Sequence, residues 1–108
     1  MTLKELMTLE RILLEIDLNY KFELSFNEAY RLYEYLKQVG KITSYAFLIQ
    51  DEFNQKYGDV EKLKEYHDKI MTDEIDFNCK YIVEFIDLVA AKLNDDKINE
   101  LIGNVKFW

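Results

Sequence analysis

The stretch from Ile42 to Gly58 constrains the fold more than any other part of the chain. It contains five consecutive apolar residues, Tyr45 to Ile49, within a helical pattern of apolar positions. A helix that contacts the protein on one face only would leave part of this run in water. We therefore expect a central helix that is contacted from more than one direction. Ser44 is placed to cap its start, and Gly58 to end it in a left-handed conformation.

Capping residues and helical stripes alternate along the rest of the chain and predict further helices. Two capping boxes, Thr2 with Glu5 and Ser25 with Glu28, give two of the starts. The helix from Ser25 should end at Gly40, because glycine is the commonest residue just past a helix end. The other starts are expected at Asp59, at Thr72, Asp73 or Asp76, and at Asp95 or Asp96. These signals predict one mainly α domain over residues 1–108, a compact bundle of about five helices.

Residues 18–24 follow a different pattern, with apolar residues at alternate positions from Leu18 to Leu24. This period of two predicts a strand. A strand needs a partner, and the matching alternation lies at residues 105–108, so a minimal two-stranded ribbon would join the two segments. An extended linker with aromatic anchors is the alternative, since two-stranded ribbons are marginally stable. In both cases we expect Phe107 and Trp108 to be ordered, beside residues 18–24 or in a groove.

The first helix carries leucines on two sides, which is more than one apolar stripe requires. The residues concerned are Leu3, Leu6, Leu9, Leu13 and Leu14. Apolar surface beyond that of a single stripe usually meets a partner. We therefore expect this helix to be the least deeply integrated one, and residues 3–20 to be a surface for homo-oligomer formation.

Composition indicates a folded domain in a reducing compartment. The 108-residue chain has 49% hydrophobic residues, among them eight tyrosines and seven phenylalanines, which is ample for a core. Its single cysteine, Cys79, cannot form an internal disulfide. No stretch has the pattern of a signal peptide, and none approaches the ~20 apolar residues of a membrane span. We predict a cytoplasmic protein with no membrane contact.

Charge favours a basic partner. The net charge is −7, and residues 42–108 hold fourteen acidic against eight basic residues. This balance disfavours direct binding to nucleic acid, where lysine and arginine supply most of the affinity. The predicted partner-binding residues lie on and after the helix that begins at Asp59: Glu61, Glu65, Asp68, Asp73, Glu74 and Asp76. A solvated helix face is the competing interpretation, because lysines are interleaved with these acids.

No residue pattern predicts catalysis or metal binding. The only histidine, His67, has no second histidine or cysteine within a helical turn, so we interpret it as a half-buried, hydrogen-bonded side chain. The acidic clusters lack the spacing and the central glycine of a calcium loop. Neither a nucleophile with a nearby base nor a phosphate-binding glycine loop is present. We therefore predict no catalytic residue, no cofactor and no metal site.

Several segments, KFELSF, EAYRLYEYL, FNQKYG and INELIGNVKFW, occur in an order that resembles small helical proteins of uncharacterised function from phages and prophages of low-GC bacteria. The likeness covers most of residues 21–108 and includes no diagnostic catalytic residue. It implies a virus-encoded accessory or assembly factor in the host cytoplasm, without assigning a site.

These observations favour a non-enzymatic protein–protein interaction module. The alternative is an acidic inhibitor that mimics nucleic acid and blocks a basic groove on a partner protein, and a small enzyme is a third interpretation. Ionic strength separates the first two, because a charge-driven mimic loses affinity steeply with salt whereas an apolar helix groove does not.

Overall fold

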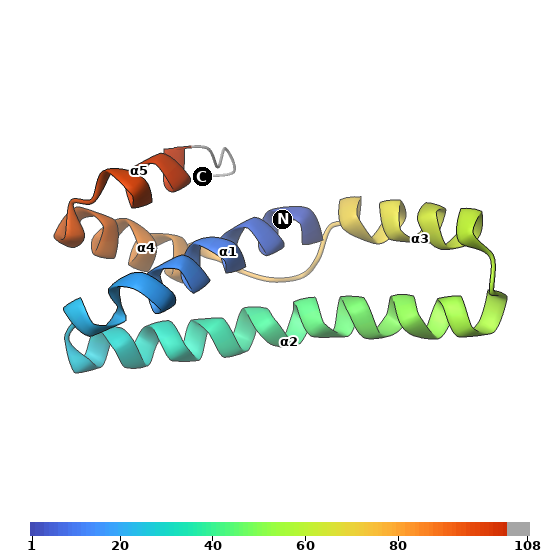
Figure 1. The fold of residues 1–108 in the computed structure, drawn as a ribbon, viewed down its shortest axis with the longest axis horizontal. Helices are drawn as coiled ribbons and strands as arrows, with labels where there is room; N and C mark the ends of the chain where they lie inside the picture. Colours follow the sequence, from blue (N-terminus) through green and yellow to red (C-terminus); the bar gives the residue numbers. More distant parts are fainter. Residues whose placement is uncertain (104–108) are drawn as a thin grey trace.

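The computed structural model describes residues 1–103, which form five α-helices and one short 3-10 turn (Figure 1). In chain order they are α1 (Leu3–Tyr20), η1 (Lys21–Glu23), α2 (Phe26–Tyr57), α3 (Val60–Thr72), α4 (Lys80–Leu93) and α5 (Asp96–Gly103). The mainly helical fold is therefore confirmed. None of these described helices is long and apolar enough to cross a membrane.

The predicted bundle of about five helices is confirmed within the described residues, but the molecule is elongated rather than compact. Its principal extents are 48 × 25 × 23 Å, and its radius of gyration is 15.8 Å. A compact domain of this length would have a radius of gyration of about 13 Å. The long dimension is set by α2, because its 32 residues span roughly 48 Å at a rise of ~1.5 Å per residue.

The predicted helix end at Gly40 and the predicted start at Ser44 are both wrong, because α2 runs through both residues. The buried stripe of α2 continues across this point in steps of three and four residues. Within that stripe, Thr43 is buried and its hydroxyl donates a hydrogen bond of 2.9 Å to the Glu10 carboxylate on α1. Continuing the helix therefore keeps it packed on α1. The predicted end at Gly58 is confirmed, with a left-handed φ of 57°.

The central helix is α1, and the expectation that it is the least integrated one is wrong. Its buried residues are Leu3, Leu6, Leu9, Ile12, Leu13 and Ile16. Figure 1 shows why two apolar sides are needed, since α1 lies between α2 and the pair α4 and α5. The leucines offered as a surface for self-association through residues 3–20 are thus mostly in the core, and Leu14 and Leu18 are the exposed ones. The stretch 42–58, predicted to be central, leaves Phe47 56% exposed.

Residues 18–24 do not form a strand. The helical pattern of α1 continues to Tyr20, and the 3-10 turn follows directly. A ribbon packed on the helices would place Leu18 and Phe22 on its covered face, but these side chains are 77% and 96% exposed. The other proposed strand, residues 105–108, lies outside the described residues, as do Phe107 and Trp108.

The last two helices complete the core. Four side chains of α4 are almost inaccessible to solvent: Ile82, Phe85, Ile86 and Val89. Helix α4 begins at Lys80 and not at the predicted caps, and the Asn78 side chain accepts the Lys80 amide hydrogen at 3.0 Å just before this start. Two ion pairs hold these helices to the first half of the chain, Lys92 with Glu28 at 2.5 Å and Lys97 with Glu15 at 2.8 Å.

Candidate functional site

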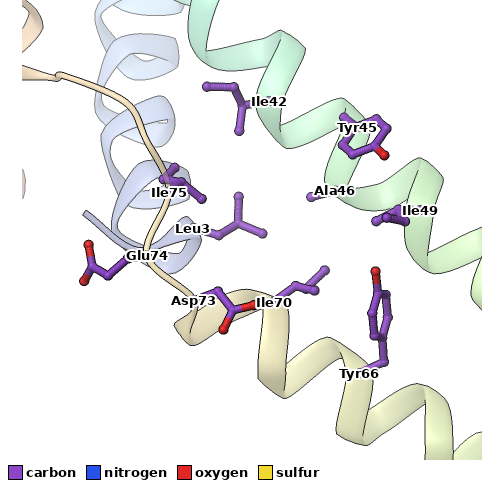
Figure 2. A pocket seen from close by; sticks show the side chains of 10 residues that line it. All are labelled: Leu3, Ile42, Tyr45, Ala46, Ile49, Tyr66, Ile70, Asp73, Glu74 and Ile75. Atoms are coloured by element: carbon purple, nitrogen blue, oxygen red, sulfur yellow. The ribbon is translucent and has the colours of Figure 1, made fainter.

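A groove of about 260 Å³ opens where the start of α1 meets the middle of α2 and the end of α3 (Figure 2). Its lining is mostly aliphatic, with two tyrosines and two carboxylates: Leu3, Ile42, Tyr45, Ala46, Ile49, Tyr66, Ile70, Asp73, Glu74 and Ile75. In Figure 2 the leucine and isoleucine side chains from the different elements converge on the space, whereas the Glu74 side chain points away from it at the edge. The groove therefore has an apolar floor and an acidic rim.

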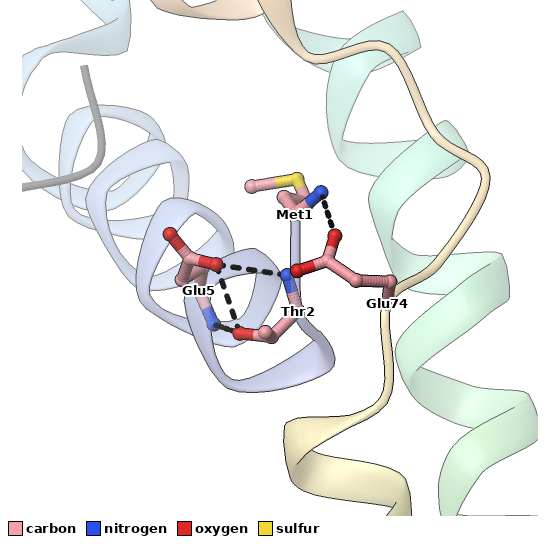
Figure 3. A network of polar contacts seen from close by, with 4 residues as sticks. All are labelled: Met1, Thr2, Glu5 and Glu74. Carbon is pink, nitrogen blue, oxygen red and sulfur yellow. Dashed lines mark hydrogen bonds and ion pairs between the residues drawn. The ribbon is translucent and has the colours of Figure 1, made fainter.

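One wall of the groove is the segment after α3, which is tied to the start of the chain (Figure 3). The Met1 ammonium group donates to the Glu74 carboxylate at 2.9 Å, and the Ile75 amide donates to the Met1 carbonyl oxygen at 2.9 Å. The Thr2 capping box fixes the first turn of α1 beside this contact. These bonds hold Leu3 and Ile75 in place at the same end of the groove.

The opposite wall is formed by α3, which two contacts join to α2. The rings of Phe53 and Tyr66 are stacked, with centroids 4.4 Å apart and planes 1° from parallel. Further along, His67 Nδ1 and Gln50 Oε1 are 2.7 Å apart, which is a hydrogen bond. The half-buried, hydrogen-bonded histidine is thus confirmed. Both contacts position Tyr66 and Ile70 at the groove.

The charges at the rim are partly neutralised. The hydrogen bond to Glu74 raises the pKa of the Met1 amino group above its ordinary value. Asp73 forms an ion pair of 3.3 Å with Lys69, one turn earlier on α3. In the capping box, the hydrogen bond from the Thr2 amide lowers the pKa of Glu5. The rim therefore contains two carboxylates, and each of them already has a cationic neighbour. The Met1 ammonium group neutralises Glu74, and Lys69 neutralises Asp73.

The structure separates the six acidic residues that the sequence predicts to meet a basic partner. Two of them, Asp73 and Glu74, line the groove. The other four are exposed and lie outside its lining: Glu61, Glu65, Asp68 and Asp76. On α3, exposed lysines at positions 62, 64 and 69 alternate with these acids. The acidic face is thus a mixed surface, of which only one end borders the groove.

Sequence reasoning missed the groove because its apolar residues come from four separate segments. Ile42, Ala46 and Ile49 follow the helical stripe of α2 and therefore read as ordinary core residues. The stripe does not reveal that α3 leaves part of it uncovered. Ile75 gave the only local signal, an apolar residue between Glu74 and Asp76 in a segment with no helical period.

The chemistry that this arrangement supports is binding. Within residues 1–103 there is no group of three histidine, cysteine, aspartate or glutamate side chains that could hold a metal ion. The polar groups that line the groove are two tyrosine hydroxyls and the Asp73 carboxylate, which can orient a bound cation or amide, whereas the Glu74 carboxylate points away and is bonded to the Met1 ammonium group. No family model, curated protein or solved structure matches this chain significantly.

Proposed function

We propose that this chain is a non-enzymatic protein-binding module whose groove takes an apolar segment of a partner protein, flanked by basic residues. The groove itself carries the proposal, because its floor is aliphatic and its rim holds Asp73 and Glu74. An apolar side chain that enters it gains about 25 cal/mol for each Å² removed from water. The Asp73 carboxylate, which is 54% exposed at the rim, favours a cationic residue next to that side chain.

The size of the groove supports a protein ligand. Its volume of about 260 Å³ falls just under the roughly 300–1,000 Å³ of typical small-molecule pockets. A partner helix or strand inserts one or two side chains into a space of this kind. The resemblance to phage and prophage proteins would place such a partner in a bacterial host, with this chain as an accessory or assembly factor.

The alternative, an acidic inhibitor that mimics nucleic acid, has less support from the geometry. Lysines are interleaved along α3, and the Met1 ammonium group and Lys69 accompany the two rim carboxylates. A mimic needs an uninterrupted row of negative charge to compete for a basic groove. The charge on this surface is better suited to raising the association rate of a partner whose affinity comes from apolar contacts.

Photocrosslinking from the groove tests the proposal directly. A photoreactive phenylalanine analogue replaces Tyr45, which lines the groove and is 61% exposed, or Tyr81 on α4, which is 66% exposed and outside it. In cells of the native host, we expect a defined protein to be crosslinked from position 45 and not from position 81. Equal crosslinking from both positions would show that the contact is nonspecific.

A matched pair of variants then measures the contribution of the groove to binding of the captured partner. Ala46→Leu fills the groove floor, whereas Ala91→Leu makes the same change at an exposed position of α4. We expect Ala46→Leu to weaken binding about tenfold or more, equivalent to ~1.4 kcal/mol, and Ala91→Leu to have no effect. Circular dichroism confirms that both variants fold. Unchanged affinity for Ala46→Leu would contradict the proposal.

The acidic residues provide the test of the alternative. For the apolar groove, reversing Glu65, Asp68 and Asp73 to lysine should slow association moderately and leave most of the affinity. If the triple reversal abolished binding, and if wild-type affinity fell steeply with salt, the mimic would be favoured over the groove.

A further inference from the structure

One side of α2 contacts no other helix within the described residues. Figure 1 shows the other helices on one side of α2, and the opposite side open along its whole length. Large side chains on that open side are strongly exposed: Phe26 at 83%, Phe47 at 56%, Tyr30 and Tyr33 at 54% each, and Leu48 at 52%. This surface, which we call the outer face of α2, adjoins the groove of the proposed function at Tyr45, which borders both.

The middle of the outer face is hollowed. The hollow is lined by Lys37, Gly40, Lys41, Ser44, Tyr45 and Leu48. Gly40 is helical, and a Cβ atom added there would meet only the Glu10 carboxylate at 3.7 Å, an ordinary contact. Neither backbone conformation nor packing on α1 therefore requires glycine at this position. Its effect on the molecule is the hollow, which lets another helix approach closely.

The residues of the outer face are self-complementary about Ser44. Gly40 lies four residues before it and Leu48 four after, so a small residue mirrors a large one. Lys41 and Phe47 lie three residues before and after, and the corresponding pair at seven residues is Lys37 and Asp51. All of these positions project from one side of a helix at 3.6 residues per turn.

We propose that the outer face of α2 pairs with the outer face of a second copy of this chain, antiparallel, about a two-fold axis at Ser44. In this arrangement each residue before the axis faces its mirror position in the other copy. Leu48 of one copy then enters the hollow over Gly40 of the other. This contact occurs twice.

Charge selects this arrangement over a parallel one. Antiparallel pairing joins Lys37 of each copy to Asp51 of the other, whereas parallel pairing would set Lys37 against Lys37 and leave the hollow empty. In the part of the chain that the structure describes, neither residue is in an ion pair. The Lys37 ammonium group lies 5.0 Å from the centre of the Tyr33 ring on its own helix, and pairing with Asp51 of the other copy would replace or extend this cation–π contact.

The size of the contact predicts a weak dimer. Because α2 ends at residue 57, whose mirror position about Ser44 is residue 31, residues 31–57 of the two helices overlap. At a rise of ~1.5 Å per residue, this overlap is roughly 40 Å long. With a contact strip about 10 Å wide, each copy covers roughly 400 Å², below the ~800 Å² per partner of a standard stable interface. A contact of this size is in the range of weak, transient association.

Analytical ultracentrifugation of the full chain, from about 1 to 500 µM, tests the pairing at concentrations that cover micromolar affinity. We expect a monomer–dimer equilibrium. Lys37→Asp and Asp51→Lys should each weaken self-association about tenfold or more, because each sets like charges together at two symmetric positions. An equimolar mixture of the two variants should regain the wild-type affinity, since a mixed dimer has two pairs of opposite charge.

Lys64→Asp, a charge reversal at an exposed position of α3, is the matched control and should leave the dimer unchanged. Circular dichroism checks that every variant remains helical. A wild-type chain that stays monomeric over the whole range overturns the proposal and leaves the outer face to a different protein. A dimer that neither single variant weakens, or a mixture that does not regain affinity, also overturns it.

Discussion

The two halves of α2 are held by different means. The first half lies on the core, where Leu32 and Val39 are fully buried beneath α1 and beside the side chains of α4. The second half pairs with α3, a helix that has no fully buried side chain. Both halves of α2 carry apolar residues at helical spacing, and more elements cover the first half than the second. The first half of α2 should therefore resist local unfolding more than the second half, although the helix is continuous.

The contrast predicts where the molecule opens first. Local opening requires little free energy where few apolar contacts are broken, and a great deal where a packed core must separate. The far half of α2 and α3, residues 44–72, should exchange with partly open forms while the core stays closed. The groove lies at the boundary between these regions. We therefore expect its wall at the start of α1 to stay closed, whereas its wall on α3 opens more easily.

The largest expected difference comes from truncating equivalent leucines in the two regions. Leu9→Ala in α1 removes a side chain with no exposed surface and should destabilise the fold by about 2–5 kcal/mol. Leu63→Ala in α3 removes a half-buried side chain and should cost about 1 kcal/mol. Chemical denaturation measures both. Similar losses for the two variants would show that α3 belongs to the same cooperative core.

The aromatic stack between the far half of α2 and α3 should control local opening. Phe53→Ala removes the ring that stacks on Tyr66 and also contacts Tyr57, at a centroid distance of 4.6 Å. We expect amides of α3 to lose about 1–2 kcal/mol of protection in hydrogen exchange. Amides of α1 and α4 should change little. A uniform loss of protection in all helices would contradict the division into two regions.

The core region should also respond to acid through Glu28. The hydrogen bond from Lys92, together with that from the Ser25 amide, lowers the pKa of Glu28 to about 2 from an ordinary value of 4.5. Because the folded-state pKa is the lower one, this carboxylate stabilises the fold above pH 4.5, and the contribution disappears as the pH falls towards 2.

Glu28→Gln keeps the capping box and removes the charge. Its melting temperature should lie below that of the wild type at pH 7, and the two should converge as the pH approaches 2. Glu5→Gln is the matched control, because Glu5 occupies the same position in the other capping box without a lysine partner in the described residues. A constant difference for Glu28→Gln at all pH values would assign the effect to packing.

The smallest expected effect is at the start of α3. The Asp59 carboxylate accepts the amide hydrogens of Glu61 and Lys62 at 2.9 and 3.2 Å. Asp59→Ala should destabilise α3 by about 1 kcal/mol, whereas Asp59→Asn preserves the cap. Hydrogen exchange of the α3 amides distinguishes the two variants. An equal effect on α1 would mean that the far region is coupled more tightly to the core than its burial indicates.

Local chemistry was predictable from the sequence, and contacts between distant segments were not. The capping boxes at Thr2 and Ser25 involve residues three positions apart, and both form as predicted. The continuation of α2 through Gly40 depends in part on the contact of Thr43 with Glu10, 33 residues earlier. No local pattern reveals such a contact. Likewise, the two leucine-rich sides of α1 indicated two partners, but not that both belong to the same chain.

The site shows the same limit. Asp73 and Glu74 were selected for their charge, and their position beside an apolar groove follows from the contact between Met1 and the segment after α3. The aliphatic residues of the groove have the spacing of core residues. Only the packing of α3 determines which of them stay accessible.

The central position of α1 has a consequence for synthesis of the chain. In chain order α1 precedes the helices that cover its second side, because α4 begins only at Lys80 and α5 at Asp96. Until that point the growing chain carries a row of leucines and isoleucines that α2 covers on one side alone. Nascent chains with such surfaces are the ones that chaperones hold and that aggregate when released early. A truncated product that ends before residue 80 should therefore be retained by chaperones, whereas a product that includes α4 and α5 should be released.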